Sequence, residues 1–319
     1  MTEKPEYNNL AGIALILAGV GLLSTMDSTA KLLIGANYSV LQILALRGWI
    51  IVFGMMLMLP RLGGFAALKT TRPKAHLLRA AVGFFAPFMF FSSLKTMPLA
   101  DTTVIFFGGG TFLMTALSVP LFKERVGPHR WAAIGVGFIG VVIAAQPGSA
   151  VFQIDSLYGL GAGIAYALMM LITRWMGSAE GVFRQVFYYN LGLAVIGSIS
   201  LPYVFLAMPV GDVMILLAMA ALATAGQYFL TRAFHVAPVS LLAPFEYSAL
   251  VWAAGLGYLI WGDVPGNPVL LGAAIIVAGG LYLAHRETLA ARRHKRAARQ
   301  ALIVADPIPV IVAIDADES

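Results

Sequence analysis

The sequence predicts an all-α integral membrane protein with about ten transmembrane helices, and three observations carry that prediction: composition, recurring apolar windows and the sign of the loop charges. Hydrophobic residues make up 60% of the 319 residues and charged residues 11%, whereas soluble domains usually carry about 25% charged residues. Because lipid offers the backbone no hydrogen bonds, only helices or closed barrels span it. The composition therefore favours helices that cross a bilayer.

Apolar windows of about 20 residues, the length that crosses a bilayer core of roughly 30 Å, recur along the chain. We expect spans at 10–34, 40–59, 76–97, 101–121, 131–146, 157–176, 183–205, 213–235, 239–261 and 269–285. Turns around Pro98 and Pro238 separate closely spaced neighbours, because the residue before a proline disfavours helical backbone angles. The first window follows a polar segment and is too long for a cleavable signal peptide.

The loops between these spans sort by charge. Basic residues collect on one side, namely Lys4, Arg61, Lys69, Arg72, Lys74, Arg79, Lys123, Arg125, Arg130, Arg174, Arg184, Arg232 and the tail from Arg286 onward. The other side carries Asp101, Asp155, Asp212 and Asp263, and its loops contain neither Lys nor Arg. The positive-inside rule then places both termini in the cytoplasm, which requires an even number of spans. Lys31, Arg47 and Lys95 fall inside spans.

An internal repeat divides the chain into two halves. A shift of 139 residues aligns 94–140 with 233–279 and matches Glu124 with Asp263, Gly127 with Gly266 and Gly140 with Gly279. Each half holds five spans, so the second half enters the membrane in the opposite direction, an arrangement typical of secondary transporters. The predicted organisation is a cytoplasmic N-terminus at 1–9, a first repeat at 10–146, a second repeat at 157–285, and a basic then flexible cytoplasmic tail at 286–319.

Motifs in both halves resemble one known family. The first half carries LKTMPLADTT at 94–103, KERVG at 123–127 and GVGFIGV at 135–141, and the second carries AFHVAPVS at 233–240, PFEY at 244–247 and GD at 262–263. Together they resemble the drug/metabolite transporter superfamily, EamA-like branch, although Asp263 stands where the family usually has Glu. The resemblance covers about residues 10–285 and implies ten transmembrane helices as two inverted five-helix repeats. It also implies a central cavity lined by helices 1, 3, 4, 6, 8 and 9, with the second span usually outside it.

Ionisable side chains inside the spans are the first candidates for a transport site, because a charge near the bilayer centre costs several kcal/mol unless it has a partner, water or a function. Glu246 lies about eight residues, or about 12 Å, into the ninth span. It is our leading candidate for a substrate or proton site. The alternative is a carboxylate held structurally by Arg47 or by a backbone amide.

Three further ionisable residues inside the spans each allow a functional and a structural interpretation. Asp27 and Lys31 are four residues apart on one helix face, where they can form an ion pair. Such a pair predicts an outer gate or a part of the cavity wall, or else a neutral contact that packs the helix. We expect Arg47 either to bind a carboxylate, from the substrate or from Asp27, or to form a structural bond to another helix. The resemblance favours the structural role for Arg47, since it implies a second span outside the cavity.

Aromatic and amide side chains supply the rest of the predicted site, because small-molecule pockets combine an apolar wall with a few polar groups. Those that fall on the helices around the implied cavity, and that we expect to bind substrate with Glu246, are Phe90, Phe107, Tyr166, Gln227, Tyr228, Tyr247 and Trp252. Four of these are favoured because a polar tip inside the membrane needs a partner: Tyr166, Gln227, Tyr228 and Tyr247.

The predicted function is secondary transport of a small organic metabolite, such as an amino acid, an amino-acid derivative or a similar amphipathic solute, across the inner membrane by alternating access. The alternative is uptake of a larger aromatic or cationic metabolite, like riboflavin or S-adenosylmethionine, whose transporters the PLAD and PFEY stretches resemble. A membrane-embedded enzyme is the remote alternative, because the spans hold no Cys and no nucleophile with a base at recognisable spacing.

The expected partners follow from this function. They are the solute, membrane lipids and a candidate coupling proton, and a homo-oligomer is compatible with the sequence. We expect no cofactor, no metal and no nucleic acid, since Cys is absent, the five His are scattered, and the basic residues sit in loops.

Overall fold

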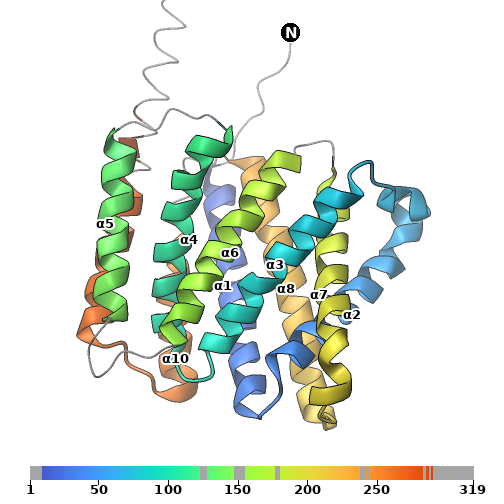
Figure 1. The fold of residues 1–319 in the computed structure, drawn as a ribbon. Helices are drawn as coiled ribbons and strands as arrows, with labels where there is room; N and C mark the ends of the chain where they lie inside the picture. The colour runs from blue at the N-terminus through green and yellow to red at the C-terminus, as the bar shows by residue number, and fades with distance from the viewer. Residues whose placement is uncertain are drawn as a thin grey trace, which may run out of the picture.

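The computed structural model describes residues 9–122, 128–146, 155–176, 180–237, 242, 245–282, 285–286 and 289, and this part of the chain contains helices and turns but no strand (Figure 1). The helices are α1 (Asn9–Gly35), α2 (Val40–Met58), α3 (Pro73–Ser93), α4 (Leu99–Phe122), α5 (Pro128–Ala145), α6 (Asp155–Met176), α7 (Val182–Val204), α8 (Val210–Val236) and α10 (Ser248–Trp261), followed by a helix at Asn267–Tyr282. Two 3-10 turns, η1 (Leu59–Leu62) and η2 (Gly64–Leu68), lie between α2 and α3.

The predicted spans match these helices to within a few residues, except at two places. The third span ends at Ser93, so Lys95 lies exposed in the turn before α4, and the prediction that the Asp-rich side has no basic loop residue is wrong. The ninth span is seen as α10 from Ser248 onward, and most of 238–244 lies outside the described residues. The tails at 1–8 and beyond 289 also lie outside them.

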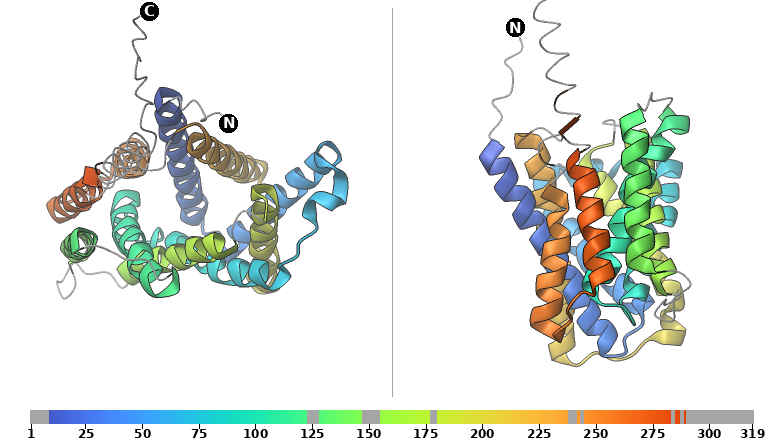
Figure 2. Two further views of the ribbon diagram at one scale, coloured as in Figure 1. Left: turned by 90° about the horizontal axis from the view of Figure 1, so that it is seen from above. Right: turned by 90° about the vertical axis from the view of Figure 1, so that its left-hand side faces the viewer.

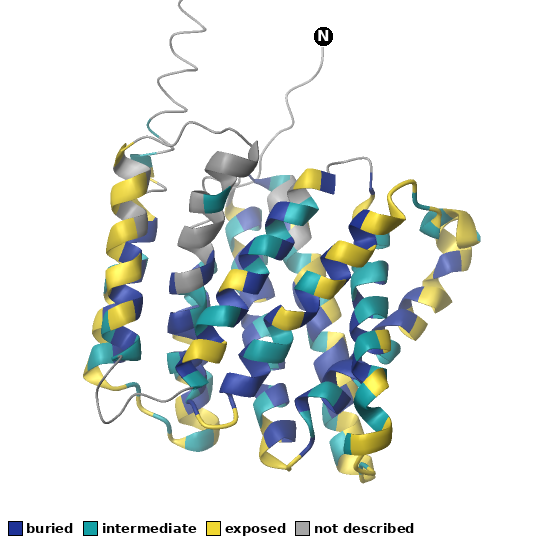
Figure 3. Cartoon of the chain, viewed as in Figure 1, coloured by how far each residue is buried: buried dark blue, intermediate teal, exposed yellow. Residues whose placement is uncertain are grey.

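The outer surface of the helix bundle is apolar. Within the part of the chain that the structure describes, six helices are long and apolar enough to cross a membrane by length and composition. Large hydrophobic side chains stay exposed on the outward faces of α2, α5, α7 and α10 (Figure 3), among them Phe53, Leu57, Phe138, Ile199, Val251 and Leu259. A surface of this kind suits lipid rather than water. The protein is a multi-pass integral membrane protein.

The helices stand around a central space, with α1 and α8 on one side and α3 and α6 on the other (Figure 2). The main packing pairs are α1 with α8, α3 with α6, α2 with α7, and α4 with both α5 and α6, and α1 also packs against α10. The beginning of α1 and the end of the helix at Asn267–Tyr282 lie at the same end of the bundle. That end is called the terminal end below, and the opposite one the distal end.

The contact between α2 and α7 depends on two glycines at matching positions. A Cβ atom on Gly48 would lie 2.7 Å from the backbone nitrogen of Ala194, and one on Gly197 would lie 2.9 Å from the Cβ atom of Ala45. Because real Cβ atoms do not approach other atoms so closely, only glycine lets the two helices pack backbone to backbone. The contact is reciprocal, since each helix presents one glycine to one alanine of the other.

A buried carboxylate joins two connections at the terminal end. The side chain of Glu180, between α6 and α7, is fully buried and accepts hydrogen bonds from Thr70 Oγ1 and Arg184 Nη1, both at 2.8 Å. Its second oxygen also lies 3.2 Å from His76 Nε2. Burial alone would raise the pKa of Glu180, but the hydrogen bonds from Arg184, His76, Thr70 and Thr71 lower it to about 2. The ionised carboxylate therefore ties the α2–α3 connection to the α6–α7 connection.

Candidate functional site

A cavity of about 560 Å³ lies between the helices, within the range of roughly 300–1,000 Å³ that is usual for small-molecule sites. Its described walls come from α1, α2, α3, α4, α6, α7, α8 and α10. The polar and charged side chains among the lining residues are Ser24, Asp27, Arg47, Arg79, Thr103, Tyr166, Tyr189, Asn190, Thr224, Gln227 and Tyr228. The remaining lining is apolar, which is the composition of a site for an amphipathic solute.

One wall of the cavity is aromatic. The Phe106 ring lies at its centre, with its centroid 5.3 Å from those of Phe90 and Tyr166 and 5.4 Å from that of Phe107. These separations are those of favourable edge-to-face and tilted ring pairs. Because the rings come from α3, α4 and α6, the wall joins the first half of the chain to the second.

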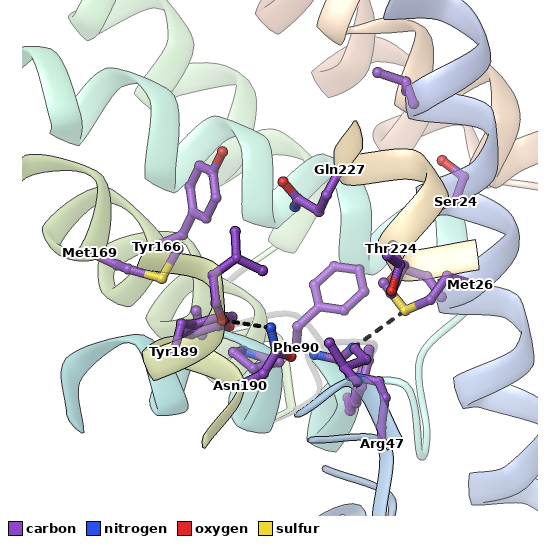
Figure 4. Close-up of a pocket in the computed structure, with 18 of the residues that line it drawn as sticks. Ser24, Met26, Arg47, Phe90, Tyr166, Met169, Tyr189, Asn190, Thr224 and Gln227 are labelled. Atoms are coloured by element: carbon purple, nitrogen blue, oxygen red, sulfur yellow. Dashed lines mark hydrogen bonds between the residues drawn. The ribbon is translucent and has the colours of Figure 1, made fainter. Parts of the chain in front are cut away.

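Arg47 brings a buried cation to the cavity. The residue is 5% exposed, its Nη1 donates to the Met26 sulfur at 3.5 Å, and its guanidinium carbon lies 5.9 Å from the centroid of the Phe91 ring. Figure 4 shows Arg47 and Met26 among the lining side chains, joined by this weak hydrogen bond. Asp27 of α1 lines the same cavity and interacts with Arg47 electrostatically. The lining of the cavity therefore contains both a guanidinium and a carboxyl group.

A second guanidinium, that of Arg79, is hydrogen-bonded to protein groups. Its Nε donates to Thr173 Oγ1 at 2.7 Å and its Nη1 to the Gln185 carbonyl oxygen at 2.8 Å. Its guanidinium carbon also lies 5.2 Å from the centroid of the Tyr189 ring. Arg79 thus holds α3 against α6 and α7.

The cavity is separated from a second hollow at the distal end, which is lined by Lys31, Tyr38, Lys95 and Trp261 among others. None of the described residues lines both hollows. Between them packs a layer of Ala30, Leu33, Phe91 and Leu94, each at most 2% exposed. We call these four residues the closure layer.

Polar contacts bind the two halves of the chain together beyond the closure layer. Lys31 Nζ lies 3.0 Å from a carboxylate oxygen of Asp263 and 4.7 Å from the centroid of the Trp261 ring. The Tyr38 hydroxyl donates to Asp212 at 2.6 Å. Each contact joins α1 or the turn that follows it to a segment of the second half at the distal end.

The ion pair expected between Asp27 and Lys31 does not form. Asp27 faces the cavity, whereas Lys31, one helical turn further along α1, faces the distal hollow and pairs with Asp263 instead. The closure layer at Ala30 and Leu33 separates the two environments. The expectation that the second span lies outside the cavity is also wrong, because Arg47, with Ile51, Met55 and Met58 of α2, lines it.

The predicted substrate-binding residues divide into two groups. Those that line the cavity are Phe90, Phe107, Tyr166, Gln227 and Tyr228, and those that do not are Glu246, Tyr247 and Trp252. Glu246 is half-buried just before α10 and interacts electrostatically with Tyr166 of the lining. Tyr247 packs against Gly280, and Trp252 packs against Gly21. Whether any of these residues binds substrate stays a prediction.

Other lining residues are harder to recognise from the sequence. Tyr189 and Asn190 on α7, Thr224 on α8 and Arg79 on α3 all reach the cavity. Arg79 was assigned to a cytoplasmic loop, and α7 carries no charge near its middle to mark an inward face. A polar residue in mid-span, such as Asn190, is the signal that could have identified that face. Among the described residues no group of three His, Cys, Asp or Glu could hold a metal ion.

Comparison with known proteins decides the family. No known family model matches the chain. Over 247 residues, however, the chain is 31% identical to the riboflavin transporter of Rhizobium johnstonii, a match that covers 75% of this chain and 80% of that protein. The chain belongs to the drug/metabolite transporter superfamily.

The transporter has further relatives. It is 29% identical over 234 residues to the S-adenosylmethionine uptake transporter of Rickettsia felis, which covers 73% of this chain and 79% of that protein. A crystal structure matches it with a TM-score of 0.58 at 21% identity, over 86% of this chain and 96% of that one, and shows a shared fold. Since the relatives are named as transporters, this is a membrane transporter with a small-molecule substrate, and it is not an enzyme.

Proposed function

We propose that the transporter is a gradient-driven carrier that moves a small amphipathic metabolite across the inner membrane by alternating access. The observation that carries this proposal is the central cavity. Helices of both halves build it, and the closure layer separates it from a hollow at the distal end. A carrier that exposes one site alternately to two sides needs a closure of this kind on one side at a time.

The two predicted inverted repeats gain support from the packing pairs. Under inversion α1 corresponds to α6 and α3 to α8, so the α1–α8 pair corresponds to the α6–α3 pair, and both pairs are major contacts. The α2–α7 pair corresponds to itself, as the reciprocal glycine contacts at Gly48 and Gly197 require. We therefore assign a first repeat to 10–146 and a second to 157–285.

The orientation proposed is the one that the loop charges favour. Asp155, Asp212 and Asp263 lie at the distal end. Arg61, Lys69 and Arg72 lie in the α2–α3 connection at the terminal end, and Lys74 follows in the first turn of α3. Lys95 is an exception at the distal end, but it leaves the excess of basic residues at the terminal end. The positive-inside rule then places the terminal end, and with it both termini, in the cytoplasm.

The proposed substrate is an amino acid or an amino-acid derivative with an apolar or aromatic side group. The aromatic wall around Phe106 suits such a side group, and the charges of Asp27 and Arg47 suit its polar end. A larger aromatic or cationic solute is the second candidate, because the relatives are named for riboflavin and S-adenosylmethionine. A proton at Glu246 is the proposed coupling ion.

Uptake into vesicles that contain the purified protein tests the proposal. Vesicles loaded with an unlabelled candidate solute should accumulate the same labelled solute by exchange, since a carrier with one alternating site exchanges solute without net energy. If the protein exchanges none of the amino acids, and neither S-adenosylmethionine nor riboflavin, the proposed function is rejected. A channel would instead conduct without this exchange.

Glu246→Gln separates carrier function from proton coupling in the same assay. If Glu246 carries the proton, the variant keeps exchange but loses accumulation that a pH gradient drives. Unchanged gradient dependence between pH 5 and pH 8 would show that Glu246 is structural. The matched control is Trp252→Phe, which retains an aromatic side chain at the α1–α10 contact.

A further inference from the structure

The hydrogen bonding of Arg47 is incomplete. Its side chain is buried and lines the cavity, yet its Nε has no hydrogen-bond partner among the described residues. Its Nη1 has the sulfur of Met26 at 3.5 Å, which is a weak acceptor. No carboxylate of the described residues lies within 4.0 Å of the guanidinium. Burying a cation in this way is unfavourable unless an anion completes its hydrogen bonds.

The other cavity arginine shows how a purely structural guanidinium is held in this protein. Arg79 has a hydroxyl oxygen at 2.7 Å from its Nε and a carbonyl oxygen at 2.8 Å from its Nη1. Its hydrogen bonds join α3 to α6 and α7, and they use the donors of both Nε and Nη1. The Nε atom of Arg47, by contrast, has no acceptor among the described residues, although its side chain lines the same cavity.

We propose that Arg47 binds a carboxylate group of the transported solute. The inference rests on the proposed function, because it assigns a ligand group to the same cavity. A guanidinium presents two parallel N–H donors that match the two oxygens of a carboxylate, and Nε supplies one of the donors at its edge. A carboxylate of the solute would therefore supply the acceptor that Arg47 Nε lacks.

Asp27 narrows the class of solute further. Its carboxylate lines the same cavity and interacts electrostatically with Arg47, so a doubly charged phosphate bound at Arg47 would be repelled. A carboxylate with an ammonium group beside it satisfies both residues. The aromatic wall around Phe106 then accommodates the rest of the solute. The site thus selects a zwitterionic, amino-acid-like head on an apolar or aromatic body.

Matched ligand pairs that differ in one carboxylate test this assignment. The pairs are S-adenosylmethionine with its decarboxylated form, phenylalanine with phenylethylamine, and tryptophan with tryptamine, and riboflavin serves as a ligand without a carboxylate. Dissociation constants are measured by titration of the purified full-length protein. We expect the acid of at least one pair to bind roughly 10- to 100-fold more tightly than its partner, as for a hydrogen-bonded ion pair.

Three variants separate ligand recognition from packing. Arg47→Gln should abolish the preference for the acid while the carboxylate-free partner binds as before, and Arg47→Lys should keep part of the preference. Arg72→Gln is the control, because Arg72 is exposed and does not line the cavity, and it should leave the ratio of the two constants unchanged. A variant that simply misfolds would weaken both members of a pair equally and would not change their ratio.

The outcomes are distinct. Equal binding of acid and carboxylate-free partner by the unmodified protein would overturn the inference, as would riboflavin as the sole ligand, while leaving the proposed function intact. An unchanged ratio in an Arg47→Gln variant that still binds the carboxylate-free partner as tightly as the unmodified protein does would overturn it as well. Binding of none of these probes, together with absence of exchange in vesicles, would reject the proposed function and this inference with it.

Discussion

At the scale of single residues, the partner of a charged side chain depends on which hollow the side chain faces, and not on its spacing from other charges along the helix. Asp27 and Lys31 share a face of α1, but the closure layer lies between their surroundings, and Lys31 pairs with Asp263 across the two halves. Glu180 shows the same dependence on tertiary structure, since its donors Thr70 and His76 lie more than one helix away in sequence.

The first prediction concerns the stability contributed by Glu180. Its pKa is about 2 in the folded protein against an ordinary value of 4.5. The ionised carboxylate therefore stabilises the fold fully above about pH 4.5, and this contribution is lost as the pH falls toward about 2. Glu180→Gln should lower the melting temperature at pH 7 by roughly 5 °C or more.

Thermal unfolding of the detergent-solubilised protein measures this effect. The difference in melting temperature between the unmodified protein and Glu180→Gln should shrink steadily between pH 5 and pH 3. In this range the Glu180 carboxyl becomes protonated in the unfolded state while it stays ionised in the folded protein. Thr71→Val removes one weaker donor, at 3.4 Å, and should produce a smaller change of the same sign. A difference in melting temperature that does not depend on pH would contradict the assigned role.

At the scale of elements, small residues determine how closely the helices approach. The α2–α7 contact has backbone atoms, rather than flexible side-chain ends, opposite Gly48, so neither helix can yield to a larger residue there. In contrast, Gly54 of the same helix has open space around its Cβ position. Gly48 and Gly54 therefore lie on the same helix, but only Gly48 is packed against a neighbouring backbone.

The second prediction uses this difference. Gly48→Val should disrupt the α2–α7 contact and reduce the yield of monodisperse protein on size exclusion severalfold. Gly54→Val, its control, should leave the yield close to that of the unmodified protein, because the space around Gly54 is open and valine is no worse a helix former than glycine. Equal yields for both variants would mean that the contact does not limit folding.

At the scale of the whole molecule, the closure layer and the basic α2–α3 connection at the terminal end support the proposed gate and the proposed orientation. The chain has no native cysteine, so a single introduced thiol reports on its own position without background. This property makes both the orientation and the gate accessible to chemical labelling.

The third prediction concerns orientation. Ala36, between α1 and α2, and Ala66, in η2, are both exposed and lie at opposite ends of the bundle. In intact cells a membrane-impermeant thiol reagent should label Ala36→Cys, whereas Ala66→Cys should react only after the membrane is opened. The reverse pattern would show that the termini lie outside.

The fourth prediction concerns the gate. Lys31 and Asp263 are partly exposed, and pairs of this kind contribute about 1 kcal/mol, which corresponds to roughly a fivefold change in a conformational equilibrium. Asp263→Asn should therefore increase labelling of Thr103→Cys, in the cavity wall, from the outer side by up to that factor. The charge swap Lys31→Asp with Asp263→Lys should restore slow labelling. No change in labelling rate would exclude a gating role for the pair.

Much of this fold was predictable because each span is a local apolar run, and a run of about 20 residues is recognisable without knowledge of its neighbours. The cavity was only partly predictable. Phe90, Phe107, Tyr166, Gln227 and Tyr228 were expected and do line it, but the family resemblance implied that Arg47 lies outside. The direction in which a helix face points depends on rotation about the helix axis, and for α2 this rotation is fixed by packing against α7 and α8. That information is absent from a single apolar run.

The reciprocal contact of Gly48 with Ala194 and of Gly197 with Ala45 has a further consequence. Each half of the chain carries both the protruding alanine and the glycine that receives it. Two copies of one half, inserted in opposite directions, would thus satisfy the same contact without the other half. A single five-helix segment able to insert in both orientations would already contain the information to assemble as an antiparallel pair.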